Sequence, residues 1–233
     1  MIYSRGNAAK QWIFEELDRR FGQAPVRILD VGCGPANLWP PFLQTHPNVS
    51  VLGIDSDAGA IEIGKRTHQG SSQIELRVFD AQTPLPEGLF DAVVALSTVE
   101  HVVDRGAFVR SIGGAMKSGG IAYLNYDAGH FRSHNIKERL MVPISQMLAR
   151  FGKEASYMKK VDDTTFFAQV RAEGLLIQRV RKHNIACLKG FMKQAEDNAI
   201  QDWYEFEEKL QERFSLEQLD RLMLSTTVVV QKP

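Results

Sequence analysis

Three aspartates stand at a regular interval in the first third of the chain. Asp30, Asp55 and Asp80 lie 25 residues apart, and each comes at or just before the end of a short apolar run. The turn after the first of them, Gly32-Cys33-Gly34-Pro35-Ala36, is built from small residues that let backbone N–H groups approach a ligand closely. This pattern suits a nucleoside, with Asp55 on the ribose hydroxyls and Asp80 at the adenine edge.

The same turn distinguishes between two kinds of nucleoside ligand. A dinucleotide site reads G-x-G-x-x-G, and its last glycine is replaced here by Asn37. Asp30 would also bring a negative charge close to a pyrophosphate. A ligand whose tail carries an ammonium group fits that carboxylate better, so a nicotinamide-dependent oxidoreductase is a remote alternative.

Alternating strand and helix patterns place these residues at one edge of a sheet. After a helix over 7–21, apolar runs predict strands at 26–32, 49–55, 74–80, 90–96, 121–126, 175–180 and 225–231. Asp57 and Asp104 are expected to cap the intervening helices, and Gly119-Gly120 to end the second of these, which runs through Met116. The fold class is therefore α/β, with a seven-stranded, mostly parallel, Rossmann-like sheet and helices on both faces.

Two helical insertions interrupt this rhythm, after the fifth and sixth strands. We expect one domain over 1–233: an N-terminal helix (1–22), a ligand-binding core (23–127), a helical lid (128–161), and C-terminal helices with the last two strands (162–233). The apolar stripe from Trp203 to Phe214 predicts a helix that buries against the domain.

The ordered motifs resemble those of class I S-adenosylmethionine-dependent methyltransferases. The resemblance covers about residues 25 to 127, and the last strand pair is similar to the antiparallel pair of that family. It rests on Ile28-Leu29-Asp30-Val31-Gly32-Cys33-Gly34, Val51-Leu52-Gly53-Ile54-Asp55, Phe79-Asp80-Ala81, Phe90-Asp91-Ala92-Val93-Val94, Ser97-Thr98-Val99-Glu100-His101-Val102 and Gly119-Gly120-Ile121. The departure is Ala36, where the family often has a third glycine.

The resemblance implies S-adenosylmethionine as cofactor, S-adenosylhomocysteine as product, and a role for each matching residue. Gly32 and Gly34 would contact the methionine moiety and Asp30 would anchor the same region, while Asp55 holds the ribose. Asp80 and the Ala81 backbone would meet adenine, and Ser97 would lie near the methionine part. We include the adjacent Cys33 and Ser56 in the cofactor site.

The residues that act on the methyl acceptor are less clearly marked. His101, His130 and His134 are candidate general bases, and Tyr126 and Asp127 are candidate substrate contacts at the end of the fifth strand. Some relatives bind a divalent metal through a Glu-His pair such as Glu100-His101, but Ser97 stands where a further carboxylate would be useful, so we expect no metal. We expect His183 to be a surface residue.

The amino-acid composition argues against some classes of binding partner. The 28 basic and 28 acidic residues balance, which argues against nucleic acid, and no apolar run suggests a signal peptide or a membrane span. We therefore expect a cytoplasmic monomer or homodimer acting on a small-molecule acceptor, most simply at a hydroxyl oxygen. A carrier protein could present the acceptor, and N- or C-methylation or cofactor binding without catalysis are the alternatives.

Overall fold

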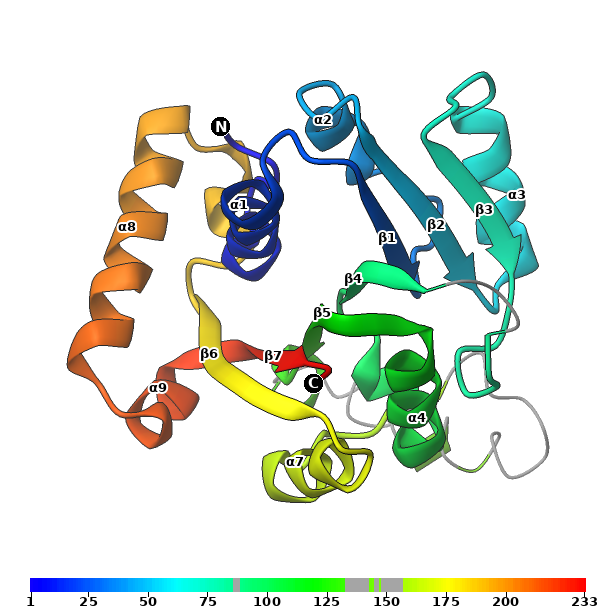
Figure 1. Ribbon diagram of the computed structural model, residues 1–233. Coiled ribbons are helices and arrows are strands. Elements are labelled where there is room, and N and C mark those ends of the chain that lie inside the picture. Colours follow the sequence, from blue (N-terminus) through cyan, green and yellow to red (C-terminus); the bar gives the residue numbers. More distant parts are fainter. Residues whose placement is uncertain (86–88, 133–142, 145–146, 148–156) are drawn as a thin grey trace.

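A single seven-stranded sheet organises the computed structural model, which describes residues 1–85, 89–132, 143–144, 147 and 157–233 (Figure 1). The strand order is β3-β2-β1-β4-β5-β7-β6, and only β7 runs antiparallel to its neighbours. The strands are β1 (Val26–Val31), β2 (Val49–Asp55), β3 (Ile74–Val78), β4 (Phe90–Ala95), β5 (Met116–Asp127), β6 (Leu176–Ile185) and β7 (Met223–Gln231). This confirms the fold class that the sequence predicts.

Helices cover both faces of the sheet. They are α1 (Ala8–Phe21), α2 (Trp39–Leu43), α3 (Ala58–Thr67), η1 (Val99–His101), α4 (Arg105–Ala115), α5 (Gly129–Arg132), α7 (Asp163–Ala172), η3 (Phe191–Gln194), α8 (Asp197–Arg213) and α9 (Leu216–Leu222). One core cluster joins α1, α2 and α3 to the sheet through side chains such as Phe14 and Phe42, and a second joins α4 and α7 through Phe108 and Phe166. The two clusters hold the central strands between two helical layers.

The central strands are nearly continuous apolar runs because both of their faces are covered. In β1 and β4 five of the six residues are buried. Asp57 and Asp104 accept backbone N–H bonds at the starts of α3 and α4, as expected. Between β1 and β4 the strand order reverses, and in such sheets ligands bind beyond the carboxyl ends of the strands at this point.

Several boundaries differ from those predicted. Helix α4 ends at Ala115 and β5 begins at Met116, so Gly119 and Gly120 lie inside the strand and do not end the helix. Gly120 serves close packing instead, since a Cβ there would lie 2.8 Å from the Lys117 carbonyl, whereas Gly119 adopts a left-handed backbone conformation with φ of +76°. The last two strands are also longer than predicted, because polar residues of β6 pair with β7 as far as Ile185.

Helix α8 buries only part of the stripe that the sequence suggests. Trp203 is 3% exposed and packs with Ala8 of α1, but Phe206 and Phe214 are 50% and 40% exposed. The expectation that the whole stripe is buried is therefore wrong. One side of the helix packs against α1 and β6, as Figure 1 shows. Tyr204 and Glu207 are also buried on this side.

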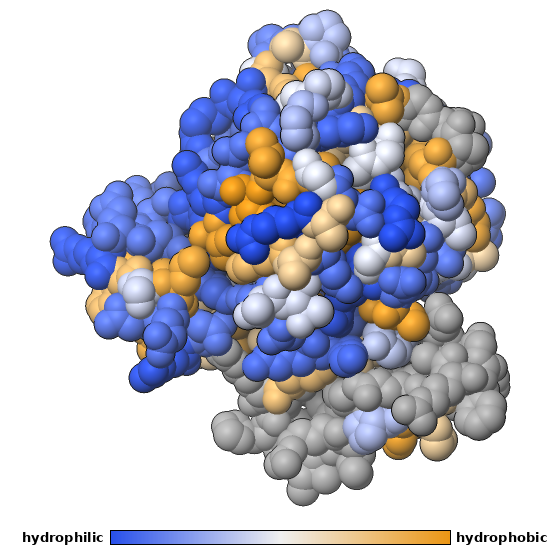
Figure 2. Space-filling view, turned by 60° about the horizontal axis from the view of Figure 1, so that its bottom comes forward, coloured by the Kyte–Doolittle hydropathy of each residue, from blue (hydrophilic) through white to orange (hydrophobic). Residues whose placement is uncertain are grey.

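Most of the predicted lid, 128–161, lies outside the described residues, so its helical character stays a prediction. The face of the molecule in Figure 2 is largely hydrophilic, and its apolar side chains gather toward the middle of that face. Across the described part of the chain, no helix combines the length and apolarity needed to cross a membrane.

Candidate cofactor and acceptor site

A cleft of about 670 Å³ opens at the carboxyl ends of β1, β2 and β4. This volume lies in the range of sites for small ligands. Its lining brings together eight residues that the sequence singled out: Gly32, Gly34, Asp55, Ser56, Asp80, Ala81, Ser97 and His101. The strand-end pattern therefore marked one contiguous site.

Asp55 is fixed in place by the backbone around it. Its Oδ2 accepts the N–H of Gly34 at 2.8 Å, and its Oδ1 accepts the N–H of Asp57 at 2.9 Å. Each carboxylate oxygen retains capacity for a second hydrogen bond. Since the side chain is half-buried at the edge of the cleft, this carboxylate is prepared to accept bonds from a pair of neighbouring hydroxyls.

The turn after β1 depends on left-handed backbone conformations. Gly32 and Gly34 have φ of +69° and +52°, and Ala36, at the position of the absent third glycine, has φ of +58°. Ala36 therefore preserves the turn at a cost of about 1–2 kcal/mol in strain. It is 2% exposed and packs in the core cluster of α1 and α2, contacts a glycine would not make.

The two glycines of this turn should respond differently to the same substitution. In Gly32→Ala the new Cβ would lie 2.5 Å from Thr98 Oγ1 and 2.7 Å from Thr98 Cγ2, whereas in Gly34→Ala it would meet nothing within 4 Å. Thr98 cannot easily move because its hydroxyl donates to the Val31 carbonyl at 3.0 Å.

We expect Gly32→Ala to lower the free energy of unfolding by about 2–4 kcal/mol, and Gly34→Ala by about 1 kcal/mol. Urea denaturation of both variants measures the difference. Gly34→Ala should keep the fold but weaken ligand binding, because its methyl group enters the cleft. Equal losses of stability would contradict the role of Thr98.

Asp30 and Cys33 lie beneath the cleft and are not part of its lining. Asp30 is 5% exposed, and its Oδ2 accepts the indole N–H of Trp39 at 2.6 Å. Burial raises the pKa of Asp30 to about 6, partly offset by Trp39 and by the nearby Lys10. Burial also raises the pKa of the Cys33 thiol, which packs against Gly53, so this thiol is a structural group.

Two further predicted cofactor residues form opposite sides of the cleft. Asp80 is exposed on the rim and its Oδ1 accepts the backbone N–H of Gln82 at 2.9 Å. Ser97 has φ of +55°, and its N–H donates to Asn125 Oδ1 at 3.3 Å. A strained non-glycine residue at the end of β4 is typical of a functional position.

The predicted acceptor residues fall into two groups. His101 lines the cleft, and its Nδ1 donates a hydrogen bond to the Tyr157 carbonyl at 3.0 Å, since a carbonyl oxygen can only accept. Tyr126 and Asp127 line a separate pocket of about 300 Å³ at the end of β5 and the start of β7. The Tyr126 hydroxyl donates to Asp163 at 2.7 Å, and Asp127 pairs with Lys189.

Three other histidines were considered from the sequence: His130, His134 and His183. The side chain of His130 and the whole of His134 lie outside the described residues, so their role as bases stays a prediction. His183 is 2% exposed within β6, so its assignment to the surface is wrong. The cause is the extension of β6, which turns this polar residue toward Trp12 of α1.

The sequence motifs assigned no role to three residues that support the site. The Trp39 indole donates to Asp30 and the Asn125 amide oxygen accepts the N–H of Ser97, while Thr98 occupies the space that a Cβ on Gly32 would need. A tryptophan in a short proline-containing helix directly after the Gly-rich turn was the one available signal.

Glu100 is a buried carboxylate between the cleft and the pocket beside it. It is 0% exposed; its Oε1 accepts the Asp127 N–H at 3.1 Å, and its Oε2 has no hydrogen-bond partner among the described residues. Burial raises the pKa of Glu100 from its ordinary 4.5 to about 7, although backbone hydrogen bonds oppose the rise. The folded protein thus keeps a proton that the unfolded chain releases.

We expect the contribution of Glu100 to the stability of the cofactor-free protein to fall as the pH rises from about 4.5 to 7. The Glu100 side chain binds more protons in the folded than in the unfolded chain in this window, so its contribution falls by up to about 3 kcal/mol, whereas His183, whose pKa is lowered by burial, changes the stability in the opposite direction. Asp30, raised from 3.8 to about 6, adds a loss of the same sign. Urea denaturation at pH 5 and pH 8 should show a smaller difference for Glu100→Gln than for the matched surface variant Glu62→Gln; equal differences would contradict this account.

Comparison with known proteins agrees with this geometry. Residues 29–124 match the model of a methyltransferase domain. The chain is 36% identical over 97 residues to a ubiquinone biosynthesis O-methyltransferase of Bradyrhizobium sp. (strain ORS 278), covering 41% of this chain and 38% of the relative. A solved S-adenosylmethionine-dependent methyltransferase from Mesorhizobium loti superposes with a TM-score of 0.64 over 96% of this chain and 98% of its own, at 18% identity.

Over residues 29–124 the chain is therefore similar to methyltransferase domains, and the solved structure shows that it shares their fold. The matched residues run from the second half of β1 through β2, β3 and β4 to most of β5, and they include the ends of β1 to β4 that border the cleft. The chain spans between about two fifths and half of the length of its curated relatives; the one from Methylocella silvestris is 32% identical over 129 residues and half covered. The fold is also shared by the [4+2]-cyclase SpnF, at a TM-score of 0.62, 16% identity and coverage of 95% of this chain and 80% of the cyclase.

Proposed function

We propose that this chain binds S-adenosylmethionine in the cleft and transfers its methyl group to an oxygen atom of a small-molecule acceptor. The observation that carries the proposal is Asp55, whose two oxygens are positioned by Gly34 and Asp57 at the cleft edge. On one side of the cleft the Gly-rich turn would let the cofactor approach the backbone closely. On the other side Asp80 offers a polar group to the adenine. The O-methyltransferase names of the matched relatives support oxygen as the acceptor atom.

The residues present fit this cofactor. Gly34 leaves open space where a side chain would stand, and the cleft volume accommodates a nucleoside with an amino acid tail. Asp55 would hold the ribose and Asp80 with Ala81 the adenine, while Gly32, Gly34, Ser56 and Ser97 would surround the remainder. Asp30, which lies beneath the cleft, would influence cofactor binding indirectly, through the conformation and the charge of the Gly-rich turn.

The protein's part in the reaction is positioning and proton transfer. The sulfonium of S-adenosylmethionine supplies an activated methyl group, so the chain needs to orient an acceptor oxygen and exclude water. His101, with its lone pair on Nε2, would accept the hydroxyl proton at the rim of the cleft. Asp127 and Tyr126 would contact the acceptor from the pocket at the end of β5.

Calorimetric titration with S-adenosylmethionine, S-adenosylhomocysteine and NAD tests the cofactor, and release of S-adenosylhomocysteine in a screen of hydroxylated acceptors tests the reaction. Micromolar binding of the first two ligands without NAD binding supports the proposal. Binding of NAD alone would overturn it. Cofactor binding without turnover on any hydroxyl, amine or carbon acceptor would favour a non-catalytic protein.

A further inference from the structure

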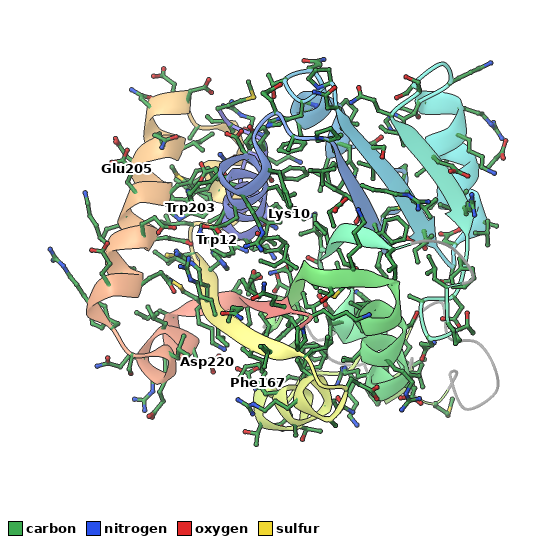
Figure 3. All side chains as sticks on the ribbon, viewed as in Figure 1. Lys10, Trp12, Phe167, Trp203, Glu205 and Asp220 are labelled. Carbon is green, nitrogen blue, oxygen red and sulfur yellow. The ribbon has the colours of Figure 1, made fainter. Side chains whose placement is uncertain are left out.

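Asn125 is a buried amide in the part of β5 that pairs with β7. It is 1% exposed, and Thr227 lies opposite it in the pair. Strands β5 and β7 run side by side, and side chains stand on both sides of them (Figure 3). Burial of an amide is costly unless its polar atoms find hydrogen-bond partners. Asn125 meets this condition with three hydrogen bonds to β7 and one to a residue of the cofactor cleft.

The partners of Asn125 fix the orientation of its amide. Its Nδ2 donates toward Ser225 Oγ at 2.8 Å, the Thr226 carbonyl at 3.1 Å and Thr227 Oγ1 at 3.0 Å, all in β7. Its Oδ1 accepts the N–H of Ser97 at 3.3 Å. A backbone carbonyl can only accept and a backbone N–H can only donate, so the reversed amide would lose both of these bonds. The β7 partners therefore hold Oδ1 toward Ser97.

Ser97 has a backbone conformation that needs support. It follows β4 with φ of +55°, in the left-handed region that residues other than glycine rarely adopt, and it lines the cofactor cleft. Such a conformation persists where surrounding contacts enforce it. Asn125 supplies two contacts, because its main-chain oxygen also accepts the N–H of Thr98 at 3.4 Å. The Thr98 hydroxyl donates to the Val31 carbonyl at 3.0 Å, so the turn after β4 is held between β5 and β1.

We infer that Asn125 is a positioning residue of the cofactor site, which holds Ser97 in the left-handed conformation that shapes the cleft at the end of β4. Asn125 itself does not line the cleft, so it would act on the cofactor through Ser97. The inference rests on the proposed function, in which this cleft binds S-adenosylmethionine. A purely structural role would instead confine the effect of Asn125 to the pairing of β5 with β7.

Asn125→Ala tests this role because it removes the acceptor for the Ser97 N–H. We expect the dissociation constant for S-adenosylhomocysteine, measured by isothermal titration calorimetry, to rise about fivefold to tenfold, which corresponds to one hydrogen bond. Ser97→Gly provides the matched background, since glycine adopts a positive φ without support. In that background Asn125→Ala should raise the dissociation constant by less than about twofold. Equal effects of Asn125→Ala in the two backgrounds would overturn the inference.

Thr227→Val is the control for a structural role. It removes one of the three β7 partners of the amide and leaves Ser225 Oγ and the Thr226 carbonyl to hold it. The variant should lower the free energy of unfolding in urea while the dissociation constant stays within about twofold. An equal rise of the dissociation constant in Asn125→Ala and Thr227→Val would also overturn the inference, because the cleft would then respond to lost stability alone.

Hydrogen exchange measured by NMR follows the Ser97 amide without any ligand. In the unmodified, cofactor-free protein this amide should exchange at least about tenfold more slowly than an unstructured one. The protection should be lost in Asn125→Ala and kept in Thr227→Val. An unprotected Ser97 amide in the unmodified protein would overturn the inference even if Asn125→Ala did not fold. If the unmodified protein binds no S-adenosylhomocysteine, the proposed function fails, and the protection of Ser97 in these variants still decides whether Asn125 holds the turn.

Discussion

Asp55→Ala is expected to lower the affinity for S-adenosylmethionine and S-adenosylhomocysteine by at least about 100-fold. The substitution removes a carboxylate that would accept two hydroxyl hydrogen bonds, each worth about 1.5–3 kcal/mol when one partner is charged. It also releases the N–H groups of Gly34 and Asp57, which Asp55 now orders. Asp55→Ala therefore removes both the ordering of the Gly-rich turn and the carboxylate that would bind the ribose. Isothermal titration calorimetry measures the resulting loss of affinity.

A graded series separates these two contributions. Asp55→Asn keeps one oxygen to accept a backbone N–H and should lose less affinity than Asp55→Ala, whereas the matched α3 surface variant Glu62→Gln should bind as the unmodified protein does. Thermal denaturation checks that each variant is folded. Unchanged affinity in a folded Asp55→Ala would place the ribose elsewhere and remove the main support for the proposed cofactor site.

Much of the fold could be predicted because its signals are local. The apolar runs ending in Asp30 and Asp55 specify strands buried on both faces, and the caps at Asp57 and Asp104 fix where helices begin. Strand β6 was shortened in the prediction because its second half is polar. Its residues are buried by α8 and β7, a tertiary effect that no periodicity within β6 records.

The candidate site likewise contains residues that local sequence patterns could predict and residues whose positions depend on tertiary contacts. The ends of parallel strands meet at one edge of the sheet, so the sequence could indicate Gly32, Asp55 and Ser97 as neighbours. It could not indicate that Asp30 lies under the cleft, because that depends on Trp39, a residue of the following helix. Nor could spacing show that Tyr126 is engaged by Asp163, some 37 residues later.

His101→Gln is expected to lower kcat by about 10²–10⁴-fold on a hydroxyl acceptor while the affinity for S-adenosylmethionine stays within about twofold. The reason is geometric: Nδ1 donates to the Tyr157 carbonyl, so Nε2 of this cleft residue is the nitrogen that would accept a proton. Glutamine keeps a donor for that carbonyl but cannot take a proton.

A change of acceptor supplies the control for this variant. A carboxylate acceptor is already deprotonated and needs no base, so His101→Gln should methylate it nearly as fast as the unmodified protein does, if the cleft admits both acceptors. Loss of turnover on both acceptors would instead assign His101 to ordering the segment around Tyr157. Loss confined to the hydroxyl acceptor would establish that this histidine moves the proton, and would connect oxygen methylation to the neighbouring ends of β4 and β5, where Glu100 and Asp127 also meet.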